Sequence, residues 1–219
     1  MWVFDTHSYD SVAWCYDELA GIYSLGRIGR SKHESIASLE PGERVLFAGV
    51  GRGREAIEAA RRGVRVSAVD LSPRMLARFS RATQGETLTA NAVLGDVALH
   101  RPEELYDAVV ANYFLNLFDA EHAMSMLEKL CALVRPGGSL QFADFAPHEG
   151  GGVSRWLTEA YYRPVNWIGW GLGYCALHAI PDYPRMLASL GIRVRSVRRF
   201  PLLWGGNPAF VTISAERIG

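Results

Sequence analysis

The chain has 219 residues, of which 49% are hydrophobic, and this suits one domain with a large core rather than two domains. Its 23 basic and 23 acidic residues balance, so no overall field favours a nucleic acid or an anionic surface, and a nucleic-acid substrate is disfavoured. No uninterrupted apolar stretch reaches the roughly 18 residues of a membrane span. We therefore expect a soluble protein whose contact with membranes is at most peripheral.

The three cysteines, Cys15, Cys131 and Cys175, are odd in number and widely separated. This pattern indicates reduced thiols in a cytoplasmic protein, and we expect each cysteine to be a small buried residue. No His-rich or Cys-rich spacing predicts a metal site. The sequence leaves both a monomer and a homodimer open.

In chain order, the first expected element is a helical cap over residues 1–35. A Tyr-Asp pair recurs within it, and Tyr9 and Tyr16, seven positions apart, share one helix face. Packing of this amphipathic helix on a sheet is one interpretation of the shared face. Contact with a ligand is the other.

Residues 44–70 read as a strand, a glycine loop, a helix and a second strand. The short apolar run before the loop is typical of a parallel strand buried on both faces, and Gly49, Gly51 and Gly53 let the backbone turn tightly. Asp70 ends the second strand, 21 positions after Gly49. Because an ionised carboxylate there can accept hydrogen bonds from both hydroxyls of a ribose, the segment predicts a nucleoside site.

Beyond Asp70, strand-like and helix-like segments keep alternating, which indicates a parallel sheet with helices on both faces. Ser72 can cap a helix that begins at Pro73, and Asp119 can cap a long helix that the Arg-Pro-Gly-Gly sequence of residues 135–138 ends. Further strands are expected at residues 93–96, 106–112, 139–144, 192–200 and 209–215, with a helix at 184–190. The last two strands are close enough in sequence for an antiparallel hairpin.

The glycine order is G-x-G-x-G rather than the G-x-G-x-x-G of dinucleotide folds. With the acidic end of the second strand, the Leu-Val-Arg-Pro-Gly-Gly sequence and the terminal hairpin, it resembles the class I S-adenosylmethionine-dependent methyltransferases. The resemblance is close over residues 36–144 and implies an α/β fold, namely a Rossmann-like, seven-stranded, mostly parallel sheet with an antiparallel C-terminal hairpin. The family often has an acidic residue at the position of Phe47, so this chain is expected to hold the cofactor's amino group in another way.

The resemblance also implies which residues bind S-adenosylmethionine. Asp70 would hold the ribose and Asp96 the adenine amino group, although Asp96 could simply cap the next turn. Asn112 could equally be a turn residue, and Tyr113 and Phe114 could belong to the core. The expected cofactor contacts are Tyr16, Gly49, Gly51, Gly53, Asp70, Leu71, Met75, Asp96, Val97, Asn112, Tyr113 and Phe114.

The segments outside this core are expected to select the methyl acceptor. The N-terminal pattern resembles the cap of methyltransferases that act on quinones and other small lipophilic acceptors, where a ring beside a desolvated sulfonium is worth about 2 kcal/mol. Residues 145–183 are rich in Trp and Tyr, which predicts an aromatic lid for a flat apolar substrate, although a protein or membrane interface or a lid without a ligand fits too. The expected substrate contacts are Tyr9, Trp156, Tyr162, Trp167 and Trp170.

Methyl transfer from a sulfonium is an in-line displacement that needs alignment and exclusion of water. A general base is needed only for a protonated acceptor, and the candidates are Asp144 at the end of the fifth strand, His148 just beyond it and His178. No Asn-Pro-Pro-aromatic sequence follows the fourth strand, which weighs against the amino-group methylases of DNA and glutamine.

We therefore predict O-, C- or N-methylation of a small lipophilic or aromatic molecule. The expected organisation is a single domain with a cap at 1–35, a cofactor-binding core at 36–144, a lid at 145–183 and a last helix and hairpin at 184–219. Two alternatives stay open: a methyltransferase-like partner protein without activity, and a nicotinamide-dependent oxidoreductase.

Overall fold

The computed structural model describes residues 24–86, 88–147, 180–201 and 207–218. Several predicted positions lie outside these residues: Tyr9, Cys15, Tyr16, His148, Trp156, Tyr162, Trp167, Trp170, Cys175 and His178.

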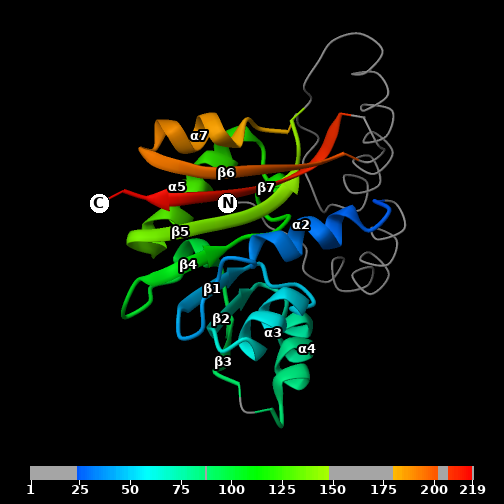
Figure 1. The fold of residues 1–219 in the computed structure, drawn as a ribbon. Helices are drawn as coiled ribbons and strands as arrows, with labels where there is room; N and C mark the ends of the chain where they lie inside the picture. Colours follow the sequence, from blue (N-terminus) through cyan, green and yellow to red (C-terminus); the bar gives the residue numbers. More distant parts are fainter. Residues whose placement is uncertain (1–23, 87, 148–179, 202–206, 219) are drawn as a thin grey trace.

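A seven-stranded sheet runs through the described residues in the order β3-β2-β1-β4-β5-β7-β6 (Figure 1). The strands are β1 (Arg44–Ala48), β2 (Arg65–Asp70), β3 (Ala90–Leu94), β4 (Tyr106–Val110), β5 (Val134–Phe145), β6 (Ile192–Pro201) and β7 (Pro208–Arg217). Strands β1 to β5 are parallel, whereas β7 pairs antiparallel with both β5 and β6. The predicted fold class, including the terminal hairpin, is confirmed.

Helices cover both faces of this sheet. The helices are α2 (Arg27–Ser35), α3 (Arg54–Arg61), α4 (Pro73–Thr83), α5 (Ala120–Leu133) and α7 (Tyr183–Ser189), with short 3₁₀ turns η1 (Val97–Leu99) and η2 (Leu115–Leu117). Within the described ranges, no helix combines the length and the apolar character that a membrane crossing requires.

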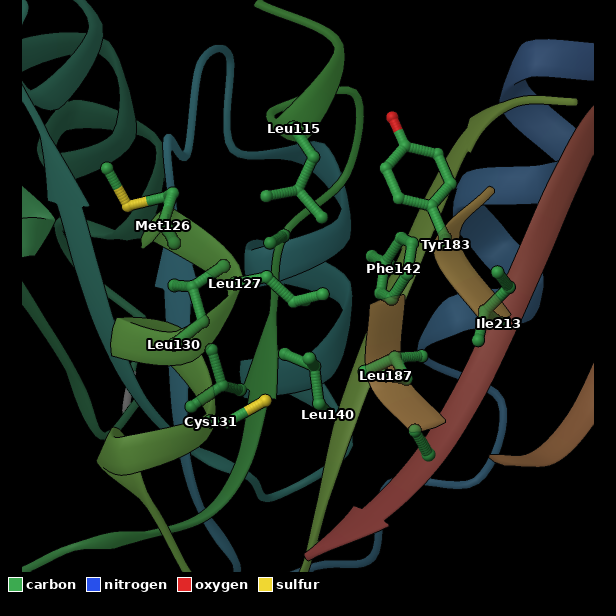
Figure 2. Close-up of a cluster of buried hydrophobic side chains, with 14 of the residues drawn as sticks. Leu115, Met126, Leu127, Leu130, Cys131, Leu140, Phe142, Tyr183, Leu187 and Ile213 are labelled. Atoms are coloured by element: carbon green, nitrogen blue, oxygen red, sulfur yellow. The ribbon is translucent and has the colours of Figure 1, made fainter. Parts of the chain in front are cut away.

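Two hydrophobic clusters fill the space between the sheet and the helices. Because successive residues of a strand point to opposite faces, Leu46 joins the cluster under α5 and α7, and Phe47 joins the cluster under α3 and α4. Figure 2 shows the first cluster, in which Leu130 of α5 and Leu187 of α7 approach the strands on either side of Leu140. Each fully buried side chain of this size contributes about 1.5–3 kcal/mol. The two clusters therefore hold the helices of each face against the sheet.

Two helices begin where the sequence predicts. The Ser72 hydroxyl accepts a hydrogen bond from the Met75 amide at 3.2 Å, and the Asp119 carboxylate accepts one from the His122 amide at 2.9 Å. Such caps satisfy amide groups that have no partner inside the helix and are worth about 1 kcal/mol each. Both predicted caps are confirmed.

The predicted boundaries of the fifth strand are wrong. Strand β5 begins directly after α5, and residues 135–138 form a bulge within it rather than a turn before it, because Tyr106 pairs with Val134 but Ala108 pairs with Ser139. A Cβ on Gly138 would lie 2.6 Å from the Asp107 carbonyl oxygen, so the bulge needs a glycine there.

The third strand also differs from its prediction, since β3 ends at Leu94 and does not include residues 95–96. It is an edge strand with several exposed side chains, so its sequence lacks the alternation that a half-buried strand shows.

Candidate functional site

The strand order places the candidate site at the carboxyl ends of β1 and β4. Strand β1 lies between β2 and β4. After β1 the chain adds β2 and β3 on one side of it, and then crosses over to add β4 and β5 on its other side. Open α/β sheets bind ligands outside the carboxyl ends of their strands at such a point. Residues 49–53 follow β1, and residues 111–114 follow β4.

The glycine loop after β1 has a backbone that needs glycine. Gly49, Gly51 and Gly53 have φ values of 65°, 52° and 71°, in the left-handed region that other residues rarely adopt. A Cβ on Gly49 would lie 2.7 Å from the Phe114 ring and one on Gly53 would lie 2.7 Å from the Phe79 ring, whereas one on Gly51 would meet nothing within 4 Å. The loop is therefore closed against protein on two sides and open at Gly51.

Asp70 ties this loop to the end of β2. One carboxylate oxygen accepts a hydrogen bond from the Gly51 amide at 2.9 Å, and the other accepts one from the Ser72 amide at 2.8 Å. Each oxygen has a second lone pair, and the side chain is partly exposed, so Asp70 can still accept from a ligand. The α4 cap is supplied by Ser72, so capping does not explain the carboxylate.

An apolar side chain stands beside this carboxylate. Leu71 is 47% exposed, so its apolar side chain is accessible to a flat apolar ligand. Met75, by contrast, is buried. The structure thus places Leu71 at the open side of the site and Met75 beneath it in the core.

Asp96 and Val97 follow the neighbouring strand β3. Asp96 is exposed and caps η1, because its Oδ1 accepts a hydrogen bond from the Ala98 amide at 2.8 Å. Val97 is 5% exposed and belongs to the cluster under α5. The capping interpretation of Asp96 is therefore observed, and its contact with a ligand stays a prediction.

The segment after β4 is held against β5 and α2. Asn112 Oδ1 accepts a hydrogen bond from the Ala143 amide at 2.8 Å, and the Tyr113 hydroxyl lies 2.8 Å from Ser31 Oγ. The Phe114 ring packs beside Gly49, as the glycine geometry shows. All three side chains are partly exposed. The turn role of Asn112 is observed, and cofactor contacts by the three residues stay predictions.

Asp144 is the one candidate base that the structure describes, and it is fully buried. Its carboxyl group accepts hydrogen bonds from the Phe145 amide at 2.8 Å, the Asn116 amide at 3.1 Å and the Tyr183 hydroxyl at 3.0 Å. Burial raises the pKa of Asp144 to about 7, although the three hydrogen bonds oppose that rise. With no exposed atom, Asp144 does not reach the open part of the site, and its role as a base stays a prediction.

Sequence reasoning missed the two partners of this carboxyl group. Asn116 and Tyr183 lie 28 and 39 positions away from Asp144, and their residue types give no signal of the contact. Burial and the charge of Asp144 also raise the pKa of Tyr183 well above its ordinary value. Only the packing of α7 against β5 shows that the Tyr183 hydroxyl lies beside the Asp144 carboxyl group.

Phe47 leaves the end of β1 without an acid. The side chain is 4% exposed and packs in the cluster under α3 and α4. Within the described residues, no group of three or more His, Cys, Asp or Glu side chains is placed to hold a metal ion.

Residues 45–138 match the family described as "Methyltransferase domain". This part of the chain is a methyltransferase domain. The match covers every predicted cofactor contact within the described residues and ends before Asp144.

Two curated relatives of this methyltransferase domain have names that state their activity. The demethylmenaquinone methyltransferase of Thermobifida fusca is 32% identical over 143 residues, which are 63% of this chain and 59% of that protein. The tRNA 5-carboxymethoxyuridine methyltransferase of Escherichia coli is 33% identical over 110 residues, 48% of this chain and 41% of that protein. The chain therefore spans less than two thirds of the length of these relatives.

A solved structure extends the likeness to the whole fold. The 1,6-didemethyltoxoflavin-N1-methyltransferase of Burkholderia thailandensis, solved with bound 1,6-didemethyltoxoflavin and S-adenosylhomocysteine, superposes with a TM-score of 0.64. The superposition covers 100% of this chain and 93% of that one at 20% identity, and it shows that the two share a fold.

Proposed function

We propose that this protein transfers a methyl group from S-adenosylmethionine to an O, C or N atom of a small lipophilic or aromatic acceptor. The observation that carries the proposal is the glycine loop, open at Gly51 and tied to the partly exposed carboxylate of Asp70. This arrangement offers an open stretch of backbone and a carboxylate to a nucleoside at the point where open α/β sheets bind ligands.

The residues present fit the cofactor at its nucleoside end. Asp70 would accept hydrogen bonds from the ribose hydroxyls, the exposed Leu71 would cover the base, and Asp96 would accept from the adenine amino group. Bound S-adenosylmethionine supplies an activated methyl group on a sulfonium sulfur. The chain's own contribution is to align that group with the acceptor and to exclude water, which can account for about 7–11 kcal/mol of the barrier.

The acceptor class is proposed from the sequence and from the relatives. The demethylmenaquinone methyltransferase matches 63% of this chain, and the Trp- and Tyr-rich residues 145–183 suit an apolar ring. The tRNA-modifying relative matches a shorter part, and this chain lacks the net positive charge typical of nucleic-acid binding. We propose a cytoplasmic protein, as a monomer or a homodimer.

A panel of acceptors tests the proposal. The protein is incubated with S-adenosylmethionine and phenols, quinols, amines or unmodified tRNA, and mass spectrometry follows the gain of one methyl group. We expect a methylated phenol, quinol or amine and an equal amount of S-adenosylhomocysteine. Methylation of tRNA alone would contradict the acceptor class. Cofactor binding without any methylated product would favour the non-catalytic partner protein.

Two matched variants make the panel specific to the site. Asp70→Asn keeps the side-chain shape but removes the charge, and we expect turnover at low cofactor concentration to fall at least about tenfold, since hydrogen bonds to charged groups are worth about 1.5–3 kcal/mol. Asp107→Asn is the control, because Asp107 also accepts a backbone hydrogen bond, from the Arg44 amide, but lies at the start of β4. Equal losses in both variants would show that Asp70 acts through the fold alone.

A further inference from the structure

A tight turn connects β4 to η2, and hydrogen bonds hold it on β5. The Tyr113 amide donates to the Ala143 carbonyl at 2.7 Å, and the Ala143 amide donates to Asn112 Oδ1 at 2.8 Å. The third bond is the one from the Asn116 amide to the Asp144 carboxyl group at 3.1 Å. Two neighbouring residues of β5 thus fix a turn of five residues, 112–116.

This turn contains a strained residue and touches the glycine loop. Tyr113 has a φ of 51°, a left-handed conformation that costs a bulky residue about 1–3 kcal/mol and persists only where its surroundings enforce it. The next side chain, Phe114, packs against Gly49. A shift of the turn would therefore be transmitted directly to the loop that is open at Gly51.

Tyr183 completes the link on the other side of Asp144. It begins α7, is fully buried and donates its hydroxyl hydrogen bond to Asp144 at 3.0 Å. Its ring packs edge-on against Phe142, with centroids 5.3 Å apart. Figure 2 shows the Tyr183 ring beside Phe142, with its hydroxyl pointing away from Leu187 and Ile213. The ring is held by the core, and its hydroxyl is held by the carboxyl group.

We propose that Asp144 is a positioning residue for the proposed methyl transfer, whose buried carboxyl group joins Tyr183 of α7 to the turn of residues 112–116 and thereby holds the turn against the glycine loop. The inference rests on the proposed function for its effect on cofactor binding, but the link itself is independent of any ligand. Asp144 acts through the turn and does not contact the acceptor.

The link is sensitive to protonation of Asp144. The groups that act on its carboxyl are the Tyr183 hydroxyl from α7, the Asn116 amide from η2 and the Phe145 amide from β5, while β7 places Val211 opposite it. Two of its three donors are backbone amides, whose hydrogen bonds weaken when the acceptor loses its charge. Burial brings the pKa of Asp144 to about 7, so the turn is held more weakly on the acid side of neutrality.

The test compares the pH dependence of S-adenosylhomocysteine affinity in three proteins. In the wild type, we expect affinity to fall roughly fivefold between pH 8 and pH 6, as charge-assisted bonds become neutral ones. In Asp144→Asn, the affinity for S-adenosylhomocysteine should equal the low wild-type value of pH 6 at every pH. Tyr183→Phe removes a bond that favours the ionised carboxyl, so its midpoint should move up by about half a unit or more.

Tyr106→Phe is the matched control. Tyr106 is also buried, and its hydroxyl lies 2.8 Å from His100 Nε2, but it begins β4 at the opposite end of the sheet. This variant should lose stability as Tyr183→Phe does, without any change in the pH profile. An identical shift in both variants, or unchanged profiles in Asp144→Asn and Tyr183→Phe, would overturn the inference.

A second readout separates this inference from the proposed function. Hydrogen exchange of the Asn116 amide, followed by NMR at pH 8 without a ligand, should be at least about fivefold faster in Asp144→Asn than in the wild type, because its acceptor is no longer charged. If the wild type binds no S-adenosylhomocysteine, the proposed function fails, and the amide exchange still decides on the link. Equal exchange rates would refute the link even where the cofactor binds.

Discussion

At the scale of single residues, two carboxyl groups near the ends of β2 and β5 have opposite surroundings. Asp70 accepts two backbone hydrogen bonds and stays partly exposed, so a ligand can approach its carboxyl group. Asp144 also accepts two backbone bonds, but it is enclosed, and burial raises its pKa to about 7. Asp70 is suited to bind a ligand, and Asp144 is suited to fix the position of the protein segments around it.

The raised pKa of Asp144 predicts how stability depends on pH. Its pKa is 3.8 in an ordinary environment and about 7 in the folded protein, so between these values the unfolded state releases a proton that the folded state keeps. The contribution of Asp144 to the free energy of unfolding is complete below pH 3.8 and is lost as pH rises through about 7. Relative to Asp144→Asn, the wild type should lose roughly 4 kcal/mol of unfolding free energy over that range, measured by urea denaturation.

Asp107→Asn is the control for this measurement, with the opposite slope. Burial opposes ionisation of Asp107, but hydrogen bonds from the Arg44 amide and Arg135 and the charges of Arg135 and Arg65 hold its pKa below the ordinary value. The contribution of Asp107 to the free energy of unfolding is therefore lost as pH falls. Parallel pH curves for the wild type and Asp144→Asn would show that Asp144 is ionised in the folded protein throughout.

The sequence predicts the position of Asp70 at the end of its strand but not the surroundings of Asp144, for a physical reason. Asp70 is local: its distance from the glycines and the separate cap at Ser72 can both be read along the chain. The surroundings of Asp144 depend on Asn116 and Tyr183, which only the packing of distant elements brings together. Strand position alone makes Asp144 a candidate base and does not indicate that its carboxyl group is fully buried.

At the scale of elements, the glycine loop joins β1 to α3 with three residues in the left-handed region. Gly53 is the N-cap residue of α3, and Gly49 lies against Phe114. The three glycines therefore have different neighbours although their backbone conformations are alike. This difference can be tested by adding one methyl group at a time.

We expect Gly49→Ala and Gly51→Ala to separate folding from binding. Both place a Cβ at positive φ, which costs about 1 kcal/mol or more, but only the Gly49 Cβ meets the Phe114 ring, at 2.7 Å. Gly49→Ala should therefore lower the unfolding free energy more, as measured by urea denaturation. Gly51→Ala should lose more cofactor affinity per unit of lost stability, because its Cβ enters the open side of the loop. The reverse order would place the ligand elsewhere.

The order of the elements follows from the sequence, and their boundaries do so less well. Apolar runs and capping residues predict the seven strands and the helices α3, α4, α5 and α7. Helix α2 lies within the helical cap expected at 1–35, and the short turns η1 and η2 are not predicted. Residues 135–138 mislead, because a Pro-Gly-Gly sequence is typical of a turn and equally suits a bulge, and only the register with β4 distinguishes the two. Edge strand β3 misleads because it is buried too little to show alternation.

At the scale of the whole molecule, topology brings the site together. Strand order 3-2-1-4-5-7-6 puts the loops after β1 and β4 side by side, and β2 and β3 bring Asp70 and Asp96 to the same edge of the sheet. The resemblance carried by the glycine order and the terminal hairpin implies a mostly parallel sheet with an antiparallel last strand, but the order of the strands comes from the structure. The predicted cap and lid contacts lie largely in residues 1–23 and 148–179, so the acceptor end remains a proposal.

The most direct measurement of the central claim is calorimetric titration of the wild-type protein with S-adenosylhomocysteine, with NADH titrated in parallel. We predict one S-adenosylhomocysteine bound per chain, a higher unfolding temperature in its presence because the ligand binds only the folded state, and no heat with NADH. No binding of S-adenosylhomocysteine at millimolar concentration, or binding of NADH in its place, would contradict the account.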